Sequence, residues 1–442
     1  MVSSEYNTPD RISLEVIRVF LAVIHLVFTT IAIASIPKTF CRRDPFPEFL
    51  FQMLFIFPIL ILTFTVAAEF VYSLVSPMLV TALFVSALYF LRKWNTDGTF
   101  EKLQIYIDDQ PRGITFFRSA INIITSCVIL ACDFKIFPSS FYKSKAYGVG
   151  LMDTGIGLFV FSMGIVSKPV KNRKALKSLI TQASVLLALG VVRTVAIRII
   201  NYHQDEREYG RDLNAFITLG LTKLIGGLLS SISIPVLFSG LVIGFIHEVV
   251  LQSGVGNYCI NETILRITFF EANREGLISI TGFISLYLLS VFIGSIMLKS
   301  QHFEFVRFKI MMTKLSVISA ISWSLTFGFV YTTGISRRIA NFGYITWIVS
   351  LATTTLIISS LVFDVILKVI HKNDKCLPVI FDIVNFNGLV YFLVSNVLTG
   401  LVNMFLDPDK RSTAESICIL IIYMIIPCIV NRILYSKRVR IS

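Results

Sequence analysis

Long apolar runs separated by short polar stretches make up this chain from end to end. About thirteen of them approach the roughly 20 residues that a helix needs to cross a bilayer. We expect membrane helices at approximately 14–36, 47–68, 70–91, 115–132, 148–166, 178–199, 214–231, 233–251, 276–298, 310–333, 343–367, 386–405 and 416–435. Two long runs are each divided, the first at Glu69 and the second just before Pro235. The pattern predicts an all-α polytopic membrane protein with about 13 transmembrane helices in a single bundle, forming one domain over residues 1–442.

The composition agrees with this fold class. Of the 442 residues, 55% are hydrophobic and only 15% are charged, whereas globular chains carry about 25% charged residues. The net charge of +13 does not indicate nucleic acid as a partner, because the basic residues stand in short loops between apolar runs. The seven cysteines are scattered and form no CxxC pair, so we expect neither a disulfide framework nor a metal site, and no bound cofactor.

The distribution of basic residues predicts an orientation. Loops that follow odd-numbered runs hold most of the Lys and Arg, including those at 168–177 and 437–440. By the positive-inside rule these loops face the cytosol, which makes the N-terminus luminal and the C-terminus cytosolic. The triplet Asn261-Glu-Thr is a glycosylation sequon and falls on the predicted luminal side. The loop from Asp133 to Tyr147 is then luminal as well.

That loop and the run after it are the most informative part of the chain. An apolar run ends on Asp133, a lysine follows at Lys143, and the next run begins around Asp153 among several glycines. Charged groups at a membrane boundary are costly, so their concentration here favours a functional site. The alternative is that these side chains simply extend to the aqueous interface.

The amino-acid sequence of this stretch is also distinctive. Residues 133–161 read D-F-K-I-F-P-S-S-F-Y-K-S-K-A-Y-G-V-G-L-M-D-T-G-I-G-L-F-V-F. This resembles the block D-F-x-x-F-P-x-x-(F/Y)-x-K-x-x-x-(Y/W)-G-x-x-x-M-D-x-G-(V/I)-G-x-F-(V/I)-F of the inositol acyltransferases of glycosylphosphatidylinositol (GPI) synthesis, the class W or GPI-anchored wall transfer family. One departure is that Ser139 and Ser140 replace two arginines that the family usually has.

Four further blocks resemble the same family and extend the resemblance over most of the chain. They are Glu208-Tyr-Gly-Arg-Asp-Leu-Asn214, Asn273-Arg-Glu-Gly276, Arg337-Arg338-Ile-Ala-Asn341 and Asn396-Val-Leu-Thr-Gly-Leu-Val-Asn403. In the first block, the His-Trp pair of the family is replaced by Asp212-Leu213.

The resemblance implies an O-acyltransferase of the endoplasmic reticulum membrane. Its reaction would move a fatty acyl chain, expected to be palmitoyl, from acyl-CoA to the inositol hydroxyl of glucosaminyl-phosphatidylinositol. Such a reaction needs a base for the hydroxyl proton and a positive group near the oxyanion, roles that the resemblance gives to Asp133 and Lys143. The expected substrate-binding residues are Lys135, Lys145, Tyr147, Asp153, Gly155, Gly157, Arg193, Glu208, Asn214, Asn273, Arg338, Asn396 and Asn403. The expected partners are acyl-CoA, glucosaminyl-phosphatidylinositol and membrane lipid.

Structural interpretations stand beside these roles. Asp153 needs a buried partner, which we expect to be Arg118, Arg193 or Arg198, and the pair would serve packing as readily as substrate binding. The polar residues of the other blocks also suit helix capping and hydrogen bonds between helices. A multi-pass secondary transporter or a scaffold of lipid metabolism is the alternative function, although the chain shows no internal repeat of the kind such transporters have.

Overall fold

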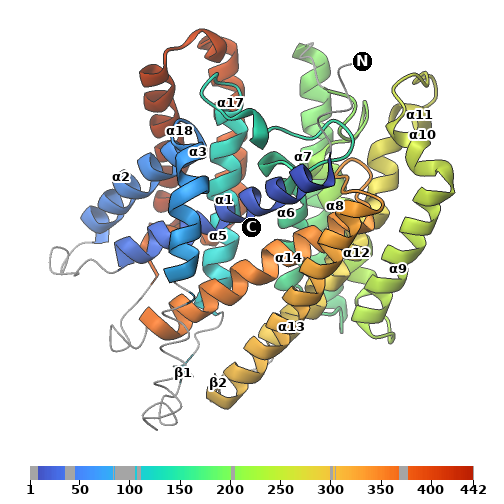
Figure 1. The fold of residues 1–442 in the computed structure, drawn as a ribbon, viewed down its shortest axis with the longest axis horizontal. Coiled ribbons are helices and arrows are strands. Elements are labelled where there is room, and N and C mark those ends of the chain that lie inside the picture. The colour runs from blue at the N-terminus through green and yellow to red at the C-terminus, as the bar shows by residue number, and fades with distance from the viewer. Residues whose placement is uncertain are drawn as a thin grey trace. The chain divides into compact units, whose positions relative to one another are not determined.

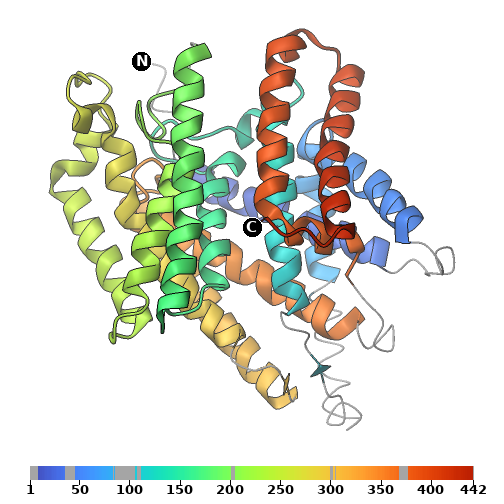
Figure 2. The ribbon, with the colours of Figure 1, turned by 180° about the vertical axis from the view of Figure 1, so that it is seen from behind.

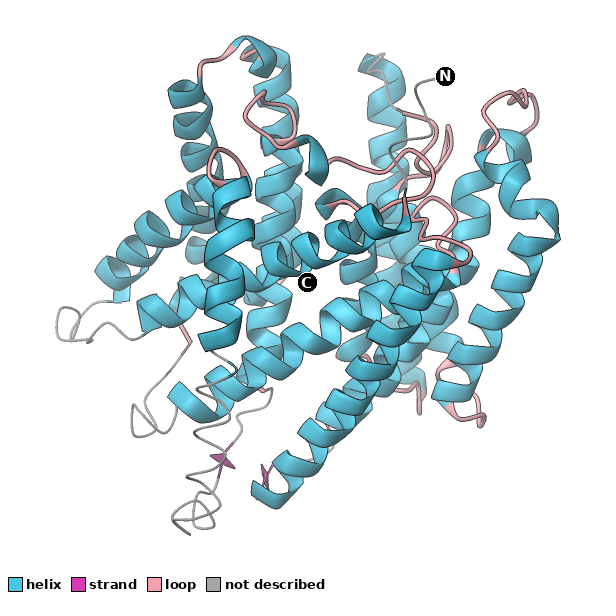
Figure 3. Ribbon diagram, in the orientation of Figure 1, coloured by secondary structure: helices cyan, strands magenta, loops and turns pink. Residues whose placement is uncertain are grey.

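A computed structural model describes residues 8–34, 45–82, 84, 105–106, 111–200, 205–298, 302–303, 305–367 and 377–441. Nearly all of the regular structure in these ranges is helix (Figure 3). The exception is a two-residue strand, β1 (Ile105–Tyr106), which pairs antiparallel with β2 (His302–Phe303). The sequence pattern did not predict this pair, because two residues are too few to establish an alternation of polar and apolar positions.

Within the described residues, ten helices are long and apolar enough to cross a membrane. They are α1 (Pro9–Ala34), α2 (Pro45–Phe64), α5 (Arg112–Ala131), α7 (Arg173–Ile200), α9 (Val236–Val250) continued through η5 (Leu251–Val255) into α10 (Gly256–Ile260), α12 (Arg274–Met297), α13 (Phe305–Tyr331), α14 (Phe342–Ser359) continued by η6 (Ser360–Ile366), α17 (Gly388–Phe405) and α18 (Thr413–Ser436). Three shorter apolar helices are α3 (Ala68–Phe70) with its continuation η2 (Val71–Val75) to Ala82, α6 (Thr154–Ile165) after η4 (Leu151–Asp153), and α8 (Ala215–Leu229). The remaining short elements are η3 (Ser139–Phe141), α11 (Phe269–Ala272), α16 (Val379–Phe386) and η7 (Pro408–Lys410).

These helices correspond to the predicted apolar runs, and the all-α polytopic membrane fold is confirmed. Both long runs are divided as predicted, although the first break lies at residues 65–67, just before Glu69, which belongs to α3. Helix α2 ends at Phe64 and a turn separates it from α3, while α8 ends at Leu229 and α9 begins after Pro235. The end of the third predicted run, beyond residue 84, lies outside the described residues.

The chain forms two compact units, each assembled from separate segments (Figure 1). Unit 1 comprises Met1–Leu14, Lys143–Lys299 and Lys314–Thr353, and unit 2 comprises Glu15–Tyr142, Ser300–Thr313 and Thr354–Ser442. Each unit is built around one central helix. The single domain predicted from the sequence stays a prediction.

Helix α12 is the centre of unit 1 and packs against α6, α8 and α9, the green and yellow helices of Figure 2. Its approach to α6 depends on two glycines. A Cβ added at Gly294 of α12 would overlap the carbonyl oxygen of Ile165, and one added at Gly164 of α6 would overlap the side chain of Ser290. Small residues thus bring the two backbones together, as is usual where membrane helices pack closely.

Helix α5 is the centre of unit 2 and packs against α2, η6, α16, α17 and α18. The buried ring of Phe116 lies 4.9 Å from those of Phe363 and Phe381, measured between centroids. At the N-terminus of α5, the Asp364 carboxylate accepts hydrogen bonds from the backbone N–H groups of Arg112 (2.7 Å) and Gly113 (3.2 Å). An acidic side chain at this position stabilises the helix, because the first N–H groups of a helix lack partners within it.

The close contact between α6 and α12 generates a prediction about stability. We expect Gly294→Ala to destabilise unit 1 by about 1–3 kcal/mol, because the new methyl group overlaps the backbone of α6. The purified protein in detergent should therefore melt at a lower temperature than the wild type.

Gly328→Ala is the matched control. Gly328 lies in α13, and a Cβ there would meet nothing within 4 Å. Because alanine favours helix more than glycine does, this variant should melt at the wild-type temperature or slightly above it. Equal melting temperatures for the two variants would contradict the assigned packing of α6 on α12.

Candidate functional site

Four polar loops meet at one end of unit 1, and we call them together the loop layer. They are residues 143–153 before α6, 205–214 between α7 and α8, 261–273 between α10 and α12, and 332–341 between α13 and α14. The backbone N–H of Gly148 donates to the carbonyl of Ile335 (2.9 Å), and that of Arg211 donates to the carbonyl of Ala272 (3.0 Å). Segments far apart in the sequence therefore share one network, and most of the charged side chains that the sequence indicated lie in it.

Asp153 is fully buried in the loop layer, at the turn that leads into α6. Its Oδ1 accepts a hydrogen bond from Arg337 Nε (2.9 Å), and its Oδ2 accepts from the backbone N–H groups of Ser144 (2.9 Å) and Gly150 (3.0 Å). The expectation of Arg118, Arg193 or Arg198 as its partner was wrong. The partner comes instead from the 332–341 loop, because this loop folds over the start of α6.

A second buried carboxylate, Glu275, lies in the first turn of α12 and is surrounded by three arginines. Arg266 donates to both of its carboxylate oxygens, at 3.0 and 2.5 Å, and Arg338 Nη2 donates to Oε1 at 3.2 Å. Arg274 Nε lies 3.8 Å from Oε1. Two of these arginines also form ion pairs with more exposed glutamates of the loop layer, at 3.9 and 3.8 Å, so opposite charges alternate in this part of it.

Lys143 forms an ion pair with Glu208 in the loop layer. The Lys143 side chain is 39% exposed, so the ammonium group stays accessible while it is held. Burial by itself would raise the pKa of Glu208, but the positive charges of Arg337 and Lys143 outweigh it and hold that pKa below its usual value. Glu208 is therefore ionised at neutral pH and can keep Lys143 in place.

Two asparagines of the loop layer, which could bind substrate or stabilise the fold, make contacts of the second type. Asn273 Oδ1 accepts from the backbone N–H groups of Asp212 (2.8 Å) and Leu213 (3.2 Å), which joins two of the loops. Asn214 is the N-cap of α8: its Oδ1 accepts from the N–H of Phe216 (3.0 Å), and its Nδ2 donates to the carbonyl of Gly190 (2.9 Å). Asn273 therefore bridges two loops and Asn214 caps a helix, which are structural roles. Substrate binding by either residue stays a prediction.

Asp133 belongs to unit 2, two residues beyond the C-terminus of α5. Asn403 of α17 donates a hydrogen bond from Nδ2 to Asp133 Oδ2 (2.9 Å). The last carbonyls of α5 form the negative end of the helix dipole, an unfavourable place for a carboxylate, and the amide of Asn403 offsets this. Unit 2 ends at Tyr142 and unit 1 resumes at Lys143, so each member of the expected pair is held by its own unit.

The aromatic residues of the family block anchor the chain between Asp133 and Lys143. Phe134, Phe137 and Phe141 are buried, and the ring of Phe141 lies 5.3 Å from that of Tyr72. Tyr142 Oη donates to the carbonyl of Cys132 at 2.8 Å. The loop is therefore fixed in unit 2 by hydrophobic burial as far as Tyr142.

The other predicted residues have varied surroundings. Lys135, Lys145 and Arg193 are exposed, Tyr147, Gly155 and Asn396 are half-buried, and Asn261 is exposed at the end of α10. Gly157 is buried in α6, where a Cβ would lie 2.6 Å from both Ile348 and the Tyr344 hydroxyl. Protein side chains thus fill the space beside Gly157, which we had expected to contact the substrate.

Sequence reasoning did not select Arg337, Glu275 or Arg266 as site residues. Arg337 and Glu275 stand inside quoted family blocks, Arg337 next to Arg338 and Glu275 two residues after Asn273. A signal was available, because a glutamate in the first turn of an apolar run requires a cation nearby. The sequence alone does not say which cation that is.

Comparisons with known proteins identify the family of this chain. The GWT1 family model matches residues 11–434. The chain is 30% identical over 353 residues to "GPI-anchored wall transfer protein 1" of Yarrowia lipolytica, covering 74% of this chain and 73% of the relative. It is 32% identical over 352 residues to the protein of the same name from Candida albicans, covering 70% and 71%.

A mammalian relative carries a more explicit name. The chain is 32% identical over 375 residues, 73% of each chain, to "Glucosaminyl-phosphatidylinositol-acyltransferase PIGW" of Bos taurus. The family model spans both units and includes every candidate residue described above. This multi-pass membrane protein therefore belongs to the GWT1 family.

Proposed function

We propose that this protein is an O-acyltransferase that moves a fatty acyl chain from acyl-CoA to the inositol hydroxyl of glucosaminyl-phosphatidylinositol. Membership of the GWT1 family and the name of the bovine relative support this function over a transporter or a scaffold. The observation that carries it is the placement of Asp133, an oriented carboxylate at a helix end, where α5 and α17 meet.

In the proposed reaction, Asp133 takes the proton of the inositol hydroxyl as the oxygen attacks the thioester carbonyl. A C–O bond forms, and the carbonyl oxygen becomes an oxyanion that a positive group stabilises. When the tetrahedral intermediate collapses, the C–S bond breaks and the CoA thiolate leaves, taking up the proton held by the base. The products are an acylated inositol and free CoA.

The contact with Asn403 suits Asp133 for the role of base. The amide is neutral, so its hydrogen bond orients the carboxylate and leaves its negative charge in place. A base must be held within hydrogen-bond reach of the proton it removes, and a fixed side chain meets this need better than a mobile one. We therefore assign Asn403 a positioning role.

Lys143 is suited to the second role, stabilisation of the oxyanion. Its ammonium is accessible, and Glu208 fixes it without enclosing it. The positive charge of Arg337 lowers the pKa of Glu208 and so keeps this carboxylate ionised and able to hold Lys143. We propose that this chain of three charges, from Arg337 through Glu208 to Lys143, sets the position of the catalytic cation.

The phosphate of the glycolipid requires basic contacts, and Ser139 and Ser140 cannot supply them. Lys145 is the best candidate in the loop layer. Its carbonyl accepts from Arg338 (2.7 Å), which fixes the backbone, while its side chain is exposed and forms no ion pair with any described residue. Lys135 is similarly exposed in unit 2. We propose that these two lysines provide positive charge for the headgroup.

The first test replaces the proposed base. Asp133→Asn keeps the shape of the side chain but removes its basicity, so acyl transfer should fall by about 10²–10⁴-fold. The measurement is transfer of labelled palmitoyl from palmitoyl-CoA to glucosaminyl-phosphatidylinositol in microsomes, normalised to protein amount. Asp407→Asn is the matched control, since Asp407 is an exposed acid just beyond α17 and should tolerate the change. Normal activity of Asp133→Asn would remove it from the mechanism.

The second test separates the cation from its support. Lys143→Ala should lower the rate by about 10²–10³-fold, because the developing oxyanion loses its countercharge. Glu208→Gln leaves Lys143 charged but loosely held, so we expect a smaller loss of roughly tenfold, and no further loss when it is combined with Lys143→Ala. Asp205→Asn, at an exposed acid in the same loop, is the control. Independent, multiplicative losses in the double variant would contradict the proposed support.

The third test concerns orientation in the endoplasmic reticulum membrane. We propose that the loop layer is luminal and that the basic loop before α7 is cytosolic. Lys145→Cys and Lys171→Cys are a matched pair, because both lysines are exposed and lie at opposite ends of α6. In a background without other cysteines, an impermeant maleimide should label position 171 in intact microsomes and position 145 only after permeabilisation. The reverse pattern would invert the proposed topology.

A further inference from the structure

The residues that follow α18 form a folded segment that packs against the start of α17. After α18, Arg438 adopts a left-handed conformation (φ 55°), and the N–H of Val439 donates back to the carbonyl of Leu434 (2.9 Å). Asn387, between α16 and α17, then holds this segment: its Nδ2 donates to the Val439 carbonyl (2.8 Å), and its Oδ1 accepts from the N–H of Ile441 (2.9 Å). Residues 438–441 are therefore held in place, and two of them, Arg438 and Arg440, are arginines.

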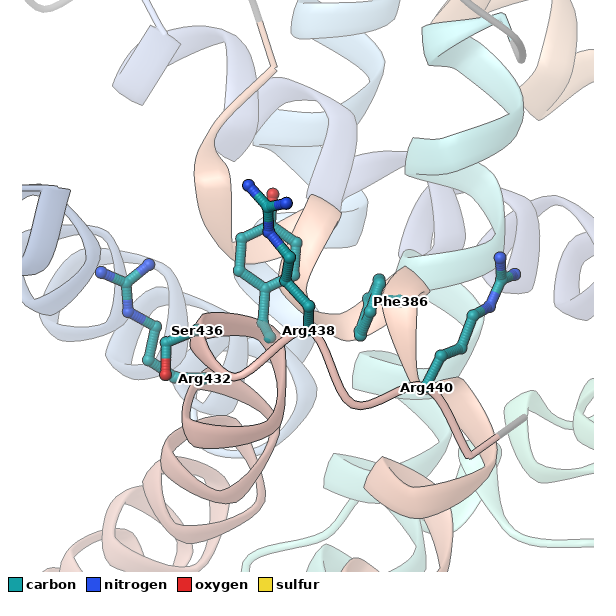
Figure 4. A pocket seen from close by; sticks show the side chains of 6 residues that line it. Phe386, Arg432, Ser436, Arg438 and Arg440 are labelled. Atoms are coloured by element: carbon teal, nitrogen blue, oxygen red, sulfur yellow. The ribbon is translucent and has the colours of Figure 1, made fainter.

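A pocket of ≈ 680 Å³ opens where this segment meets α16 and α18. It is lined by Phe386, Arg432, Tyr435, Ser436, Arg438 and Arg440. Figure 4 shows the Phe386 ring between the side chains of Arg438 and Arg440, with Arg432 on the far side of Arg438. Its volume lies within the range of roughly 300–1,000 Å³ that is typical of small-molecule sites. We call it the arginine pocket.

Two arginines of the pocket, Arg432 and Arg438, have no carboxylate partner within the described residues. Arg440 packs its guanidinium against the Phe386 ring at 5.9 Å, and Arg432 packs against Phe49 at 5.5 Å. Contacts with aromatic faces position a guanidinium without neutralising it.

A further arginine increases this positive charge from inside the bundle. Arg118 lies on α5, close enough to Arg440 for the two positive charges to repel each other. Its Nε is buried and has no hydrogen-bond partner in that part of the chain. Burying like charges near one another is unfavourable unless an anion joins them. A negatively charged ligand would therefore stabilise this cluster of arginines.

We infer that the arginine pocket binds a phosphate-bearing ligand. Guanidinium groups bind phosphate through paired N–H donors, which makes arginine the residue of choice where a phosphate must be recognised. Two sources share this chemistry, the phosphorylated nucleotide head of CoA and the headgroup of an anionic phospholipid. The CoA source rests on the proposed acyltransferase function, whereas the lipid source does not.

The position of the pocket indicates that it anchors a ligand and does not catalyse. Asn387 precedes the first residue of α17, and Asn403 lies in the last turn of the same helix, beside Asp133. At 1.5 Å per residue this helix of 18 residues is about 27 Å long. The arginine pocket and the candidate base are thus near opposite ends of α17, and the predicted orientation places the pocket on the cytosolic side.

The test measures binding to the full-length protein purified in a neutral detergent. The probes are CoA, 3′-dephospho-CoA and phosphatidylinositol in mixed micelles, each titrated against the wild type and the triple variant Arg432→Gln, Arg438→Gln, Arg440→Gln. We expect the triple variant to bind one of the phosphate ligands at least about tenfold more weakly, because charge-assisted hydrogen bonds to phosphate are lost. Increasing salt should weaken wild-type binding in parallel.

The matched control removes the same number of charges elsewhere. Lys171→Gln, Arg173→Gln and Lys174→Gln lie in or just after the exposed basic loop before α7 and should leave binding unchanged. Each single arginine variant is measured as well, with its melting temperature, so that misfolding of the triple variant does not decide the result.

The outcomes separate the sources. Tighter binding of CoA than of 3′-dephospho-CoA, lost in the arginine variants, supports the nucleotide head. Binding of phosphatidylinositol that the same variants lose supports a lipid headgroup. Equal binding by wild type, single variants and the triple variant for all three probes would overturn the inference. Absence of acyl transfer by the wild type, together with phosphate binding that the arginine variants lose, would count against the proposed function alone.

Discussion

The structure depends most on the need to neutralise two carboxylates that are buried among apolar helices. Asp153 at the start of α6 and Glu275 at the start of α12 are both fully buried. Adjacent arginines in one loop, Arg337 and Arg338, reach them. Removing one partner of a buried pair typically costs about 3–5 kcal/mol, because the remaining charge stays uncompensated. A single loop therefore fixes the starts of two helices.

The arginine loop is itself held in one conformation. Asn341 Oδ1 accepts from the backbone N–H groups of Ser336 (2.9 Å) and Tyr344 (3.1 Å), and its Nδ2 donates to the carbonyl of Gly334 (2.8 Å). Ala340 adopts a positive φ of 46°, a strained conformation for a residue with a side chain, which these bonds maintain. The asparagine of the family block thus acts on the arginines through the backbone.

The same constraint connects structure to the proposed chemistry. Arg337 neutralises the buried Asp153 and also keeps Glu208 ionised. The position of Lys143, which Glu208 holds, therefore depends on the same arginine that stabilises the fold. In unit 2, α17 has polar side chains near both ends, with Asn403 beside Asp133 and Asn387 holding the folded C-terminal segment. Helix packing in each unit therefore positions the charged groups on which both proposals depend.

Much of this protein was determined by its sequence alone. Apolar runs of membrane-spanning length predict helices under any tertiary arrangement, because the bilayer leaves no other way to satisfy their backbone hydrogen bonds. The division of the run before Pro235 followed from local chemistry. The resemblance to the family block also predicted Asp133 as the base and Lys143 as the cation of the active site.

Only the tertiary structure decided which groups meet. Asp153 pairs with Arg337, which lies 184 positions away, and not with the arginines of neighbouring runs. The glycines of α6 could have lined a groove, yet Gly157 is packed against Ile348 and Tyr344. The arginine pocket gathers residues from α16, α18 and the last residues of the chain. Charge and small size are properties of a residue, but the partner that satisfies them is chosen by the packing of helices distant in sequence.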